Sequence, residues 1–174
     1  METVRVAVLT ISDRCSRGEA SDESGAALCE IFGKPPHEVA LYAVVPDSAK
    51  LIAGALKRWT DEGLADVIVT TGGTGLSPRD RTTDATRKVL DRELPGIAML
   101  LMAEGLKSTP LAALSQGLAG TRKSTLIVNF PGSPAAVREM APCLVELLPH
   151  AVELLRGDDR GHPRDRQPAP EEPS

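Results

Sequence analysis

A run of β-branched residues that ends in a glycine-rich turn constrains the fold of this chain more than any other feature. Residues 67–71 read Val-Ile-Val-Thr-Thr, and residues 72–75 read Gly-Gly-Thr-Gly. The first run is typical of a buried strand, and the glycines let the backbone turn sharply after it. Thr82 and Thr83 can then cap a helix with an apolar face. This order predicts a strand-to-helix crossover.

The same turn has the features of a phosphate-binding segment. Glycines let a ligand approach backbone N–H groups closely, and a helix N-terminus attracts anions. The chain contains neither GxxxxGK[ST] nor GxGxxG, which excludes a P-loop and the dinucleotide-binding fingerprint. An ordinary turn between a strand and a helix is the alternative interpretation. The charged side chains of Arg79 and Asp80, together with nearby threonines, favour a ligand site.

Apolar patterns along the chain alternate between strand and helix. Further strands are predicted at residues 4–11 and 39–45, and helices at residues 24–32, 51–59, 82–94 and 97–106. Extended runs at 113–119 and 124–130 predict a hairpin and an antiparallel edge strand. Pro142 and Pro149 are expected to interrupt the last helical segment. The pattern predicts an α/β fold, a three-layer α/β/α sandwich with a mainly parallel central sheet.

Polar segments follow the predicted parallel strands. They cover residues 12–22, 46–48, 72–80 and 129–133. Ligands of such sheets bind beyond the carboxyl ends of the strands. We therefore expect these segments to converge on one site.

Length and composition indicate one globular domain. We expect it to span residues 1–156 of the 174-residue chain. Residues 157–174 are charged, rich in proline and without large apolar side chains, which predicts a disordered C-terminal tail. A net charge of −4, with one Trp, one Tyr and two Phe, argues against a nucleic-acid-binding surface.

The cysteines and the apolar segments favour the cytoplasm as the compartment. Cys15, Cys29 and Cys143 are widely spaced and odd in number, which argues against a disulfide framework or a zinc site. No apolar run is long enough to span a membrane, and we recognise no signal peptide before the first strand. The three histidines fall outside the polar segments and are assigned no role.

Several short motifs together resemble the molybdopterin adenylyltransferase family, which includes the bacterial Mog and MoaB proteins and the G domain of gephyrin. The principal motif comprises residues 70–75, 78–80 and 82–86. Further similar segments occur in family order at residues 12–14, 45–47, 94–96, 109–111, 114–115 and 129–134. The resemblance covers residues 4–156. One departure is Gln116, where many relatives have arginine.

The resemblance implies an enzyme of molybdenum cofactor biosynthesis. Family members transfer an adenylyl group from Mg²⁺-ATP to molybdopterin, release pyrophosphate, and pass adenylylated molybdopterin to a MoeA-like molybdenum insertase. It also implies a homotrimer. The apolar side chains of Ile97, Leu100, Leu101 and Leu106 are either intramolecular core or part of a contact with a neighbouring copy.

The resemblance assigns the catalytic, Mg²⁺-binding carboxylates to Asp47 and Asp80, and the presence of Asp47 favours the Mog type over the MoaB type. Mg²⁺ binds one or two carboxylates together with phosphate oxygens and water, so two aspartates from separate strand ends suit it. A structural explanation exists for each acid. Asp47 can cap the helix that follows it, and Asp80 can pair with Arg79 or Arg81.

The remaining predicted contacts come from the polar segments. The predicted substrate- and nucleotide-binding residues are Ser12, Asp13, Thr71, Gly72, Gly73, Thr74, Gly75, Ser115, Pro131, Gly132 and Ser133. Local turn hydrogen bonds are an alternative explanation for Ser12 and Asp13, and helix capping is one for Ser133. The alternative function is a non-catalytic molybdopterin-binding or scaffold protein of the same fold. A third hypothesis is another nucleotide-using enzyme on this scaffold.

Overall fold

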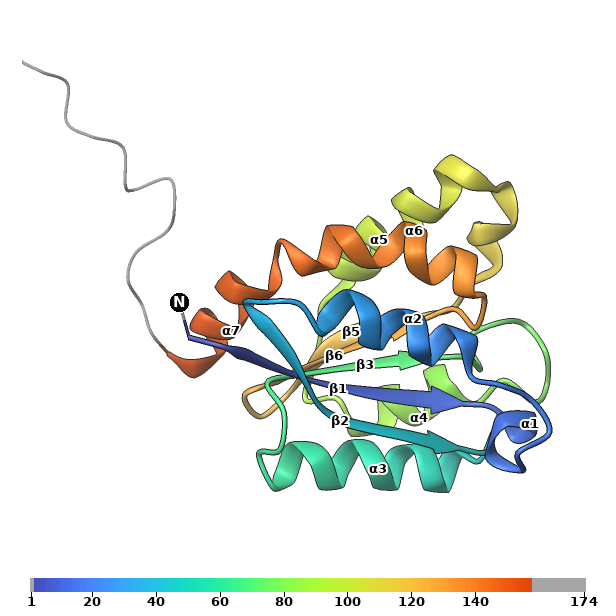
Figure 1. Cartoon of the computed structure of the whole chain (residues 1–174), viewed down its shortest axis with the longest axis horizontal. Helices are drawn as coiled ribbons and strands as arrows, with labels where there is room; N and C mark the ends of the chain where they lie inside the picture. The colour runs from blue at the N-terminus through green and yellow to red at the C-terminus, as the bar shows by residue number, and fades with distance from the viewer. Residues whose placement is uncertain (1, 158–174) are drawn as a thin grey trace, which may run out of the picture.

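The computed structural model describes residues 2–157, which form a six-stranded sheet between two layers of helices (Figure 1). The strand order is β2-β1-β3-β6-β5-β4. The parallel strands are β1 (Val4–Ile11), β2 (His37–Val45), β3 (Val67–Thr71) and β6 (Thr125–Phe130). β5 (Ala119–Arg122) pairs antiparallel with β6 and with the short edge strand β4 (Arg92–Glu93). The predicted α/β/α sandwich is therefore confirmed.

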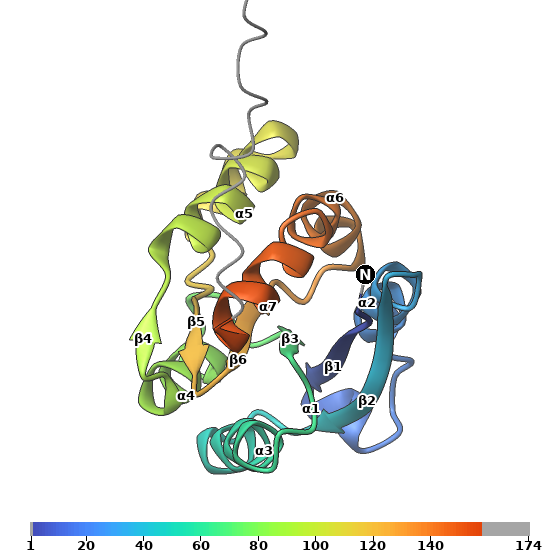
Figure 2. The same ribbon diagram turned by 90° about the vertical axis from the view of Figure 1, so that its left-hand side faces the viewer.

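Helices cover both faces of the sheet (Figure 2). One layer contains α2 (Glu23–Phe32), α5 (Pro95–Ser108), α6 (Pro134–Val145) and α7 (Leu148–Arg156). The other contains α3 (Ala49–Asp61) and α4 (Thr82–Val89). β3 and β6 are buried along their whole length because helices pack on both sides of them. This is why their sequences are nearly continuous apolar runs.

The helix after the glycine-rich turn is shorter than predicted. α4 ends at Val89, and Leu90 is already extended. The N–H groups of Asp91 and Leu94 donate to the carbonyl groups of Thr121 and Ala119 on β5. Pairing with β5 thus replaces the last predicted helical turns, and Pro95 disfavours helical backbone just before it.

The predicted antiparallel hairpin is confirmed by the pairing of β5 with β6, but its first arm and its turn lie elsewhere than predicted. Residues Pro110–Leu114 form a 3₁₀ helix, η1, because Thr109 caps it and Pro110 begins it. Strand β5 starts only at Ala119 and includes part of the segment expected to turn. The chain reverses at residues 123–124, where Lys123 adopts a φ of 51°.

The other differences concern element ends. Residues 12–22 contain one helical turn, α1 (Asp13–Ser16), and β2 begins two residues earlier than predicted. The predicted interruption at Pro142 is wrong, because α6 continues through this exposed proline to Val145. The helices separate at residues 146–147, and Pro149 sits in the first turn of α7. Leu51 is 49% exposed because it lies beside the buried Ile52–Leu56–Trp59 stripe.

None of the helices within residues 2–157 combines the length and the apolar character needed to cross a bilayer. The predicted tail at residues 158–174 lies outside the described residues.

A buried amide holds the centre of the sheet in register below the polar loops. The Asn129 side chain on β6 donates to the hydroxyl groups of Thr70 on β3 (2.9 Å) and Thr86 on α4 (3.0 Å). Its oxygen accepts from the backbone N–H of Leu118 (3.1 Å). All three polar side chains are at most 3% exposed, so these hydrogen bonds have no water to replace them.

Replacing Asn129 by leucine should lower the free energy of unfolding by about 2–4 kcal/mol, because it leaves buried hydroxyl and N–H groups without partners. Urea unfolding of the purified protein measures this. The control is a triple variant, Asn129→Leu with Thr70→Val and Thr86→Val, which removes both hydroxyl partners as well. It should recover part of the loss. A triple variant that is less stable than the single one would contradict the explanation.

Candidate functional site

The carboxyl ends of β1, β3 and β6 meet at Gly72. Its backbone has a φ of +94°, and a Cβ atom there would lie 2.3 Å from the carbonyl oxygen of Ile11. The N–H of Gly72 donates to the carbonyl of Phe130 (3.3 Å). Gly132 approaches so closely that its own Cβ would lie 3.3 Å from the Gly72 Cα. Residue 72 must therefore be glycine for the three loops to pack in this way.

The turn at residues 72–76 presents unused N–H groups. Thr82 accounts for the first two carbonyl groups: its hydroxyl donates to Gly72 (2.7 Å) and its N–H to Gly73 (3.0 Å). The N–H groups of Gly73, Thr74, Gly75 and Leu76 donate to no acceptor within residues 2–157. Consecutive free N–H groups in a glycine turn form an anion-binding concavity.

The predicted capping role of Thr82 and Thr83 is wrong. Arg81 occupies the N-cap position of α4 and makes no side-chain cap hydrogen bond. The Thr82 hydroxyl instead holds the glycine turn, and the Thr83 hydroxyl donates to the backbone of Gln116 (2.9 Å). Both hydroxyl groups thus support neighbouring loops.

Asp47 lies beside this turn with one oxygen unpartnered. Its Oδ1 atom is buried and has no hydrogen-bond partner among residues 2–157, and a Cβ on Gly73 would lie 2.8 Å from it. Burial raises the pKa of Asp47, and the negative charges of Asp13 and Asp80 raise it further. Asp47 is not the helix cap, because Ser48 caps α3. Its ionised form is therefore poorly compensated by the protein itself.

Asp13 organises the loops around Asp47. One of its oxygens accepts the backbone N–H of Asp47 (2.9 Å), and the other pairs with the guanidinium of Arg79 (2.5 Å). The hydrogen bond from Asp47 and the contact with Arg79 lower the pKa of Asp13. These contacts connect the loops after β1, β2 and β3.

Asp80 pairs with neither Arg79 nor Arg81, the two arginines that could have given it a purely structural role. Arg79 pairs with Asp13, and Arg81 lies 4.0 Å from Asp84. The Asp80 carboxylate accepts the N–H of Ser77 (3.0 Å) and lies against Gly75, whose Cβ would be 2.8 Å from it. Asp80 is thus held at the edge of the free N–H groups.

Two hollows adjoin these loops, and Gly132 lines both of them. The first, of about 400 Å³, is lined by Gly73, Thr74, Gly75, Leu76, Asp80, Leu111, Leu114, Ser115, Pro131 and Gly132. The second, of about 290 Å³, is lined by Thr10, Ile11, Ser12, Cys15, Ser21, Asp22, Glu23, Ser24, Gly72, Gly132 and Pro134. Neither Asp13 nor Asp47 is among the residues that line these two hollows.

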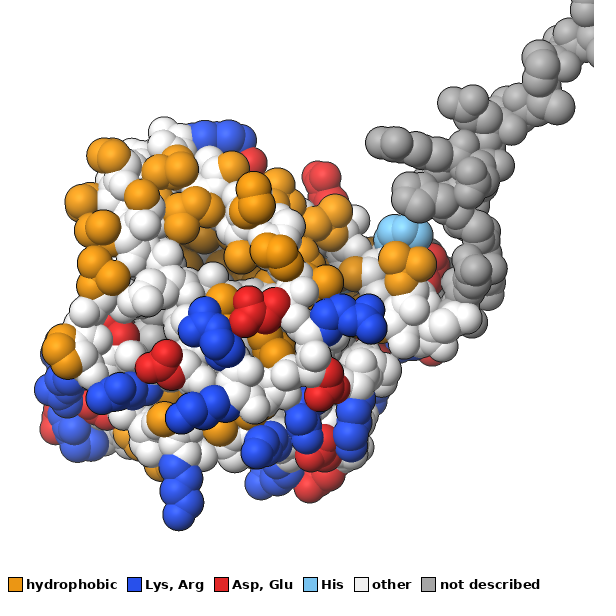
Figure 3. Space-filling view, turned by 180° about the vertical axis from the view of Figure 1, so that it is seen from behind, with side chains coloured by type: hydrophobic (Ala, Val, Ile, Leu, Met, Phe, Trp, Pro, Cys, Tyr) orange, Lys and Arg blue, Asp and Glu red, His pale blue; other side chains and the backbone are white. Residues whose placement is uncertain are grey.

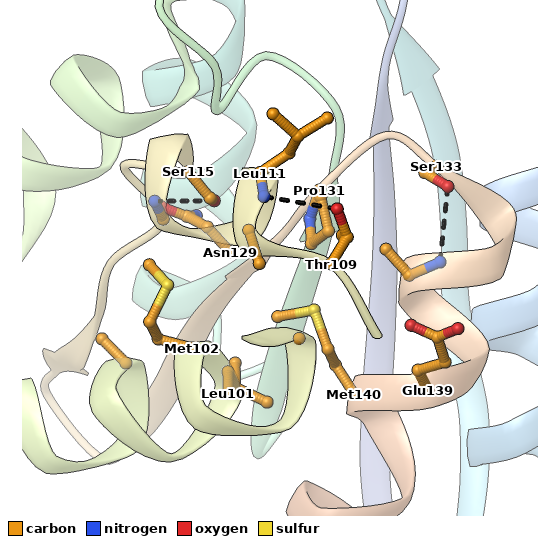
Figure 4. Close-up of a pocket in the computed structure, with 15 residues that line it drawn as sticks. Leu101, Met102, Thr109, Leu111, Ser115, Asn129, Pro131, Ser133, Glu139 and Met140 are labelled. Atoms are coloured by element: carbon orange, nitrogen blue, oxygen red, sulfur yellow. Dashed lines mark hydrogen bonds between the residues drawn. The ribbon is translucent and has the colours of Figure 1, made fainter. Parts of the chain in front are cut away.

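A third, mainly apolar cavity of about 240 Å³ adjoins the first hollow (Figure 4). Met102 from α5 and Met140 from α6 lie on its sides, and Ser115 and Pro131 line both spaces. Ser133 also lines this cavity.

The predicted hydroxyl-bearing residues mostly hold backbone groups. Ser12 caps α1 and Ser133 caps α6, as their alternative explanations required. Thr71 donates to the carbonyl of Pro131 (2.8 Å) and joins the ends of β3 and β6. Ser115 accepts from the N–H of Gly117 (3.4 Å). The sequence interpretation missed the roles of Asn129 and Gln116, whose partners lie far away along the chain.

The donor set suits a magnesium ion bound together with phosphates. Within residues 2–157 no group of three or more His, Cys, Asp or Glu side chains is placed to hold a metal. Mg²⁺ needs only one or two carboxylates when phosphate oxygens and water complete its shell. The buried, unpartnered oxygen of Asp47 and the nearby charge of Asp80 fit that requirement.

Comparisons with known proteins agree with this architecture. Residues 7–150 match the family model described as a probable molybdopterin binding domain. A molybdopterin adenylyltransferase of Helicobacter pylori is 40% identical over 161 residues, which cover 91% of this chain and 91% of that protein. The cinnamon protein of Drosophila melanogaster, a molybdenum cofactor synthesis protein, is 44% identical over 160 residues; the match covers 91% of this chain but only 26% of cinnamon.

A solved structure shows the same fold. The molybdopterin biosynthesis enzyme MoaB of Thermus thermophilus superimposes with a TM-score of 0.83 at 49% identity, covering 89% of this chain and 98% of that chain.

Changing Asp47 to asparagine should stabilise the protein at pH 7. The pKa of Asp47 is raised in the folded state above its ordinary value of 3.8. The contribution of Asp47 to the free energy of unfolding is therefore fully present below the unfolded pKa, near 3.8, and is lost as pH rises through the folded pKa. The gain in Asp47→Asn should therefore vanish as pH falls to about 4. Denaturant unfolding at both pH values measures it.

Asp61→Asn is the control of opposite sign. Hydrogen bonds from Arg122 and Lys123 lower the pKa of Asp61, so its contribution is present above the unfolded pKa and is lost as pH falls. This variant should be destabilised at pH 7. If both variants changed the free energy of unfolding at pH 7 by the same amount and in the same direction, the assignment of a poorly compensated charge to Asp47 would be refuted.

Proposed function

The chain belongs to the family of probable molybdopterin binding domains, and on that premise we propose that it is a molybdopterin adenylyltransferase of molybdenum cofactor biosynthesis. In the described part of the chain, the observation that carries the proposal is the buried, unpartnered oxygen of Asp47 beside a glycine turn with four free N–H groups. A carboxylate that lacks an internal partner and an anion-binding turn together suit a metal-bound polyphosphate.

The proposed substrates are Mg²⁺-ATP and molybdopterin. A terminal phosphate oxygen of molybdopterin attacks the α-phosphorus of ATP, a new P–O bond forms, and the bond to the β-phosphate oxygen breaks to release pyrophosphate. The protein needs no covalent intermediate; it positions two anions and offsets their charge. Two hollows that share Gly132 in their lining suit a reaction between two bound substrates.

Different residues of the site have different roles in the proposed reaction. Asp47 and Asp80 would hold Mg²⁺, which supplies charge neutralisation on the phosphates when bound. The N–H groups of residues 73–76 orient phosphate oxygens. Asp13 and Arg79 fix the loop that carries Asp47.

Asp80→Asn should reduce turnover at least about a hundredfold while molybdopterin still binds, because a charge needed mainly in the transition state is lost. Pyrophosphate release dependent on molybdopterin and Mg²⁺ measures turnover. The double variant with Asp47→Asn should be little worse than the poorer single variant if both act on one metal–ATP unit. Normal turnover in Asp80→Asn, with binding retained, would favour the non-catalytic binding protein instead.

We also propose that the protein is a homotrimer and delivers its product to a MoeA-like insertase. Of the four α5 side chains in question, Leu101 is buried, Ile97 and Leu100 are half-buried, and Leu106 is 46% exposed. Exposed Met99, Leu111 and Leu114 extend this apolar surface, and hydrophobic side chains gather on the side of the molecule where α5 lies (Figure 3). Such a patch suits an interface.

Light scattering should give about three times the chain mass of 18.4 kDa for the homotrimer proposed from the apolar patch. Leu106→Glu should lower that mass, whereas Leu51→Glu, at an equally exposed leucine on α3, should not. A wild-type monomer with full activity would refute the trimer and leave the activity unaffected.

A further inference from the structure

The carbonyl side of the glycine turn is held by two residues that lie outside it. Thr82 binds the carbonyl groups of Gly72 and Gly73, as described above. The next two carbonyl groups are bound by Gln116: its backbone N–H donates to Thr74 (2.8 Å) and its side-chain amide donates to Gly75 (2.8 Å). Four consecutive carbonyl groups are thus occupied, while the four N–H groups that follow them find no acceptor in the described part of the chain.

The planar geometry of the peptide unit means that these hydrogen bonds also fix the direction of the N–H groups in the turn. In a trans peptide unit the C=O and the following N–H point in opposite directions. Holding the carbonyl groups of Thr74 and Gly75 toward Gln116 therefore directs the N–H groups of Gly75 and Leu76 away from it. Gln116 does not line the adjoining hollow, whereas residues 73–76 do.

Gln116 itself is held from the opposite side. Its backbone carbonyl accepts the hydroxyl of Thr83, in the first turn of α4 (2.9 Å). One residue thus connects α4, the loop after η1 and the glycine turn. Its side chain is exposed, so the bond to Gly75 competes with water and adds little to stability.

We propose that Gln116 is a positioning residue for phosphate binding: its side-chain amide holds the Gly75 carbonyl so that the turn's N–H groups receive a phosphate group. The proposal rests on the proposed function. The phosphate belongs either to ATP or to molybdopterin, and the experiment distinguishes the two. Gln116 lines none of the three spaces described above, and it acts through the backbone of the turn.

The experiment compares three substitutions at Gln116. Gln116→Ala removes the donor and Gln116→Glu replaces it with a carboxylate, which repels the carbonyl. Gln116→Arg keeps N–H donors that can reach Gly75. Ser108→Ala, at an exposed residue of α5, is the control. Loss of one oriented hydrogen bond should weaken phosphate binding about fivefold in the alanine variant, with a larger loss in the glutamate variant and near-normal binding in the arginine variant and the control.

Two readouts separate this proposal from the proposed function. Titration with inorganic pyrophosphate, followed by the NMR amide signals of residues 73–76, tests the turn without any turnover. Steady-state kinetics then gives KM for ATP and for molybdopterin. A rise in one KM identifies which phosphate the turn holds.

Equal pyrophosphate affinity in the wild-type, alanine and glutamate proteins would overturn the role of Gln116, even if melting temperatures differ. Weakened pyrophosphate binding in a protein that never turns over molybdopterin would support Gln116 and refute the enzymatic proposal.

Discussion

The buried amide of Asn129 is the interaction on which the site depends. Its hydrogen bonds join β6 to β3, to α4 and to the segment before β5. The glycine turn connects β3 to α4, so both of its ends are anchored by the same side chain. A turn whose ends are held in this way can keep its N–H groups aligned without internal hydrogen bonds, because rearrangement would break buried bonds beneath it.

The loops above this network contain charge that the protein compensates unequally. Asp13 has a guanidinium and a backbone N–H as partners, and its pKa is lowered. Asp47, whose N–H binds Asp13, has a buried oxygen with no partner among residues 2–157, and its pKa is raised. Carboxylates whose pKa values are shifted in opposite directions at one edge of a sheet are typical of functional sites. A charge that the protein leaves uncompensated at such a site lowers the stability of the fold.

The two ends of the molecule use charge differently. At the amino ends of the strands, Asp66 is buried but receives hydrogen bonds from Arg5 and lies 3.0 Å from Arg156, so its ion pairs are complete. At the carboxyl ends, Asp80 lines an open hollow beside the glycine turn, whereas Asp13 and Asp47 line neither of the two hollows there. Complete ion pairs thus stabilise the fold at the amino ends of the strands. At the carboxyl ends, the N–H groups of residues 73–76 find no acceptor among residues 2–157.

The sequence by itself determined the layers of the fold and the edge at which the site lies. Continuous apolar runs such as Val67–Thr71 require cover on both faces, and the carboxyl ends of parallel strands share one edge of the sheet. The glycine turn was found in this way. Asp47 and Asp80 were assigned as catalytic carboxylates only through the resemblance to the molybdopterin adenylyltransferase family, and those roles remain predictions.

Only the tertiary structure decided which groups are satisfied. Ser48 took the cap that Asp47 could have supplied, Arg79 paired with Asp13 instead of Asp80, and Thr82 and Gln116 occupied the carbonyl side of the turn. The partners in the last three cases are 66, 10 and 41 residues apart in the chain. Hydrogen bonds at such separations depend on how the loops pack together, and local patterns along a sequence contain no information about that packing.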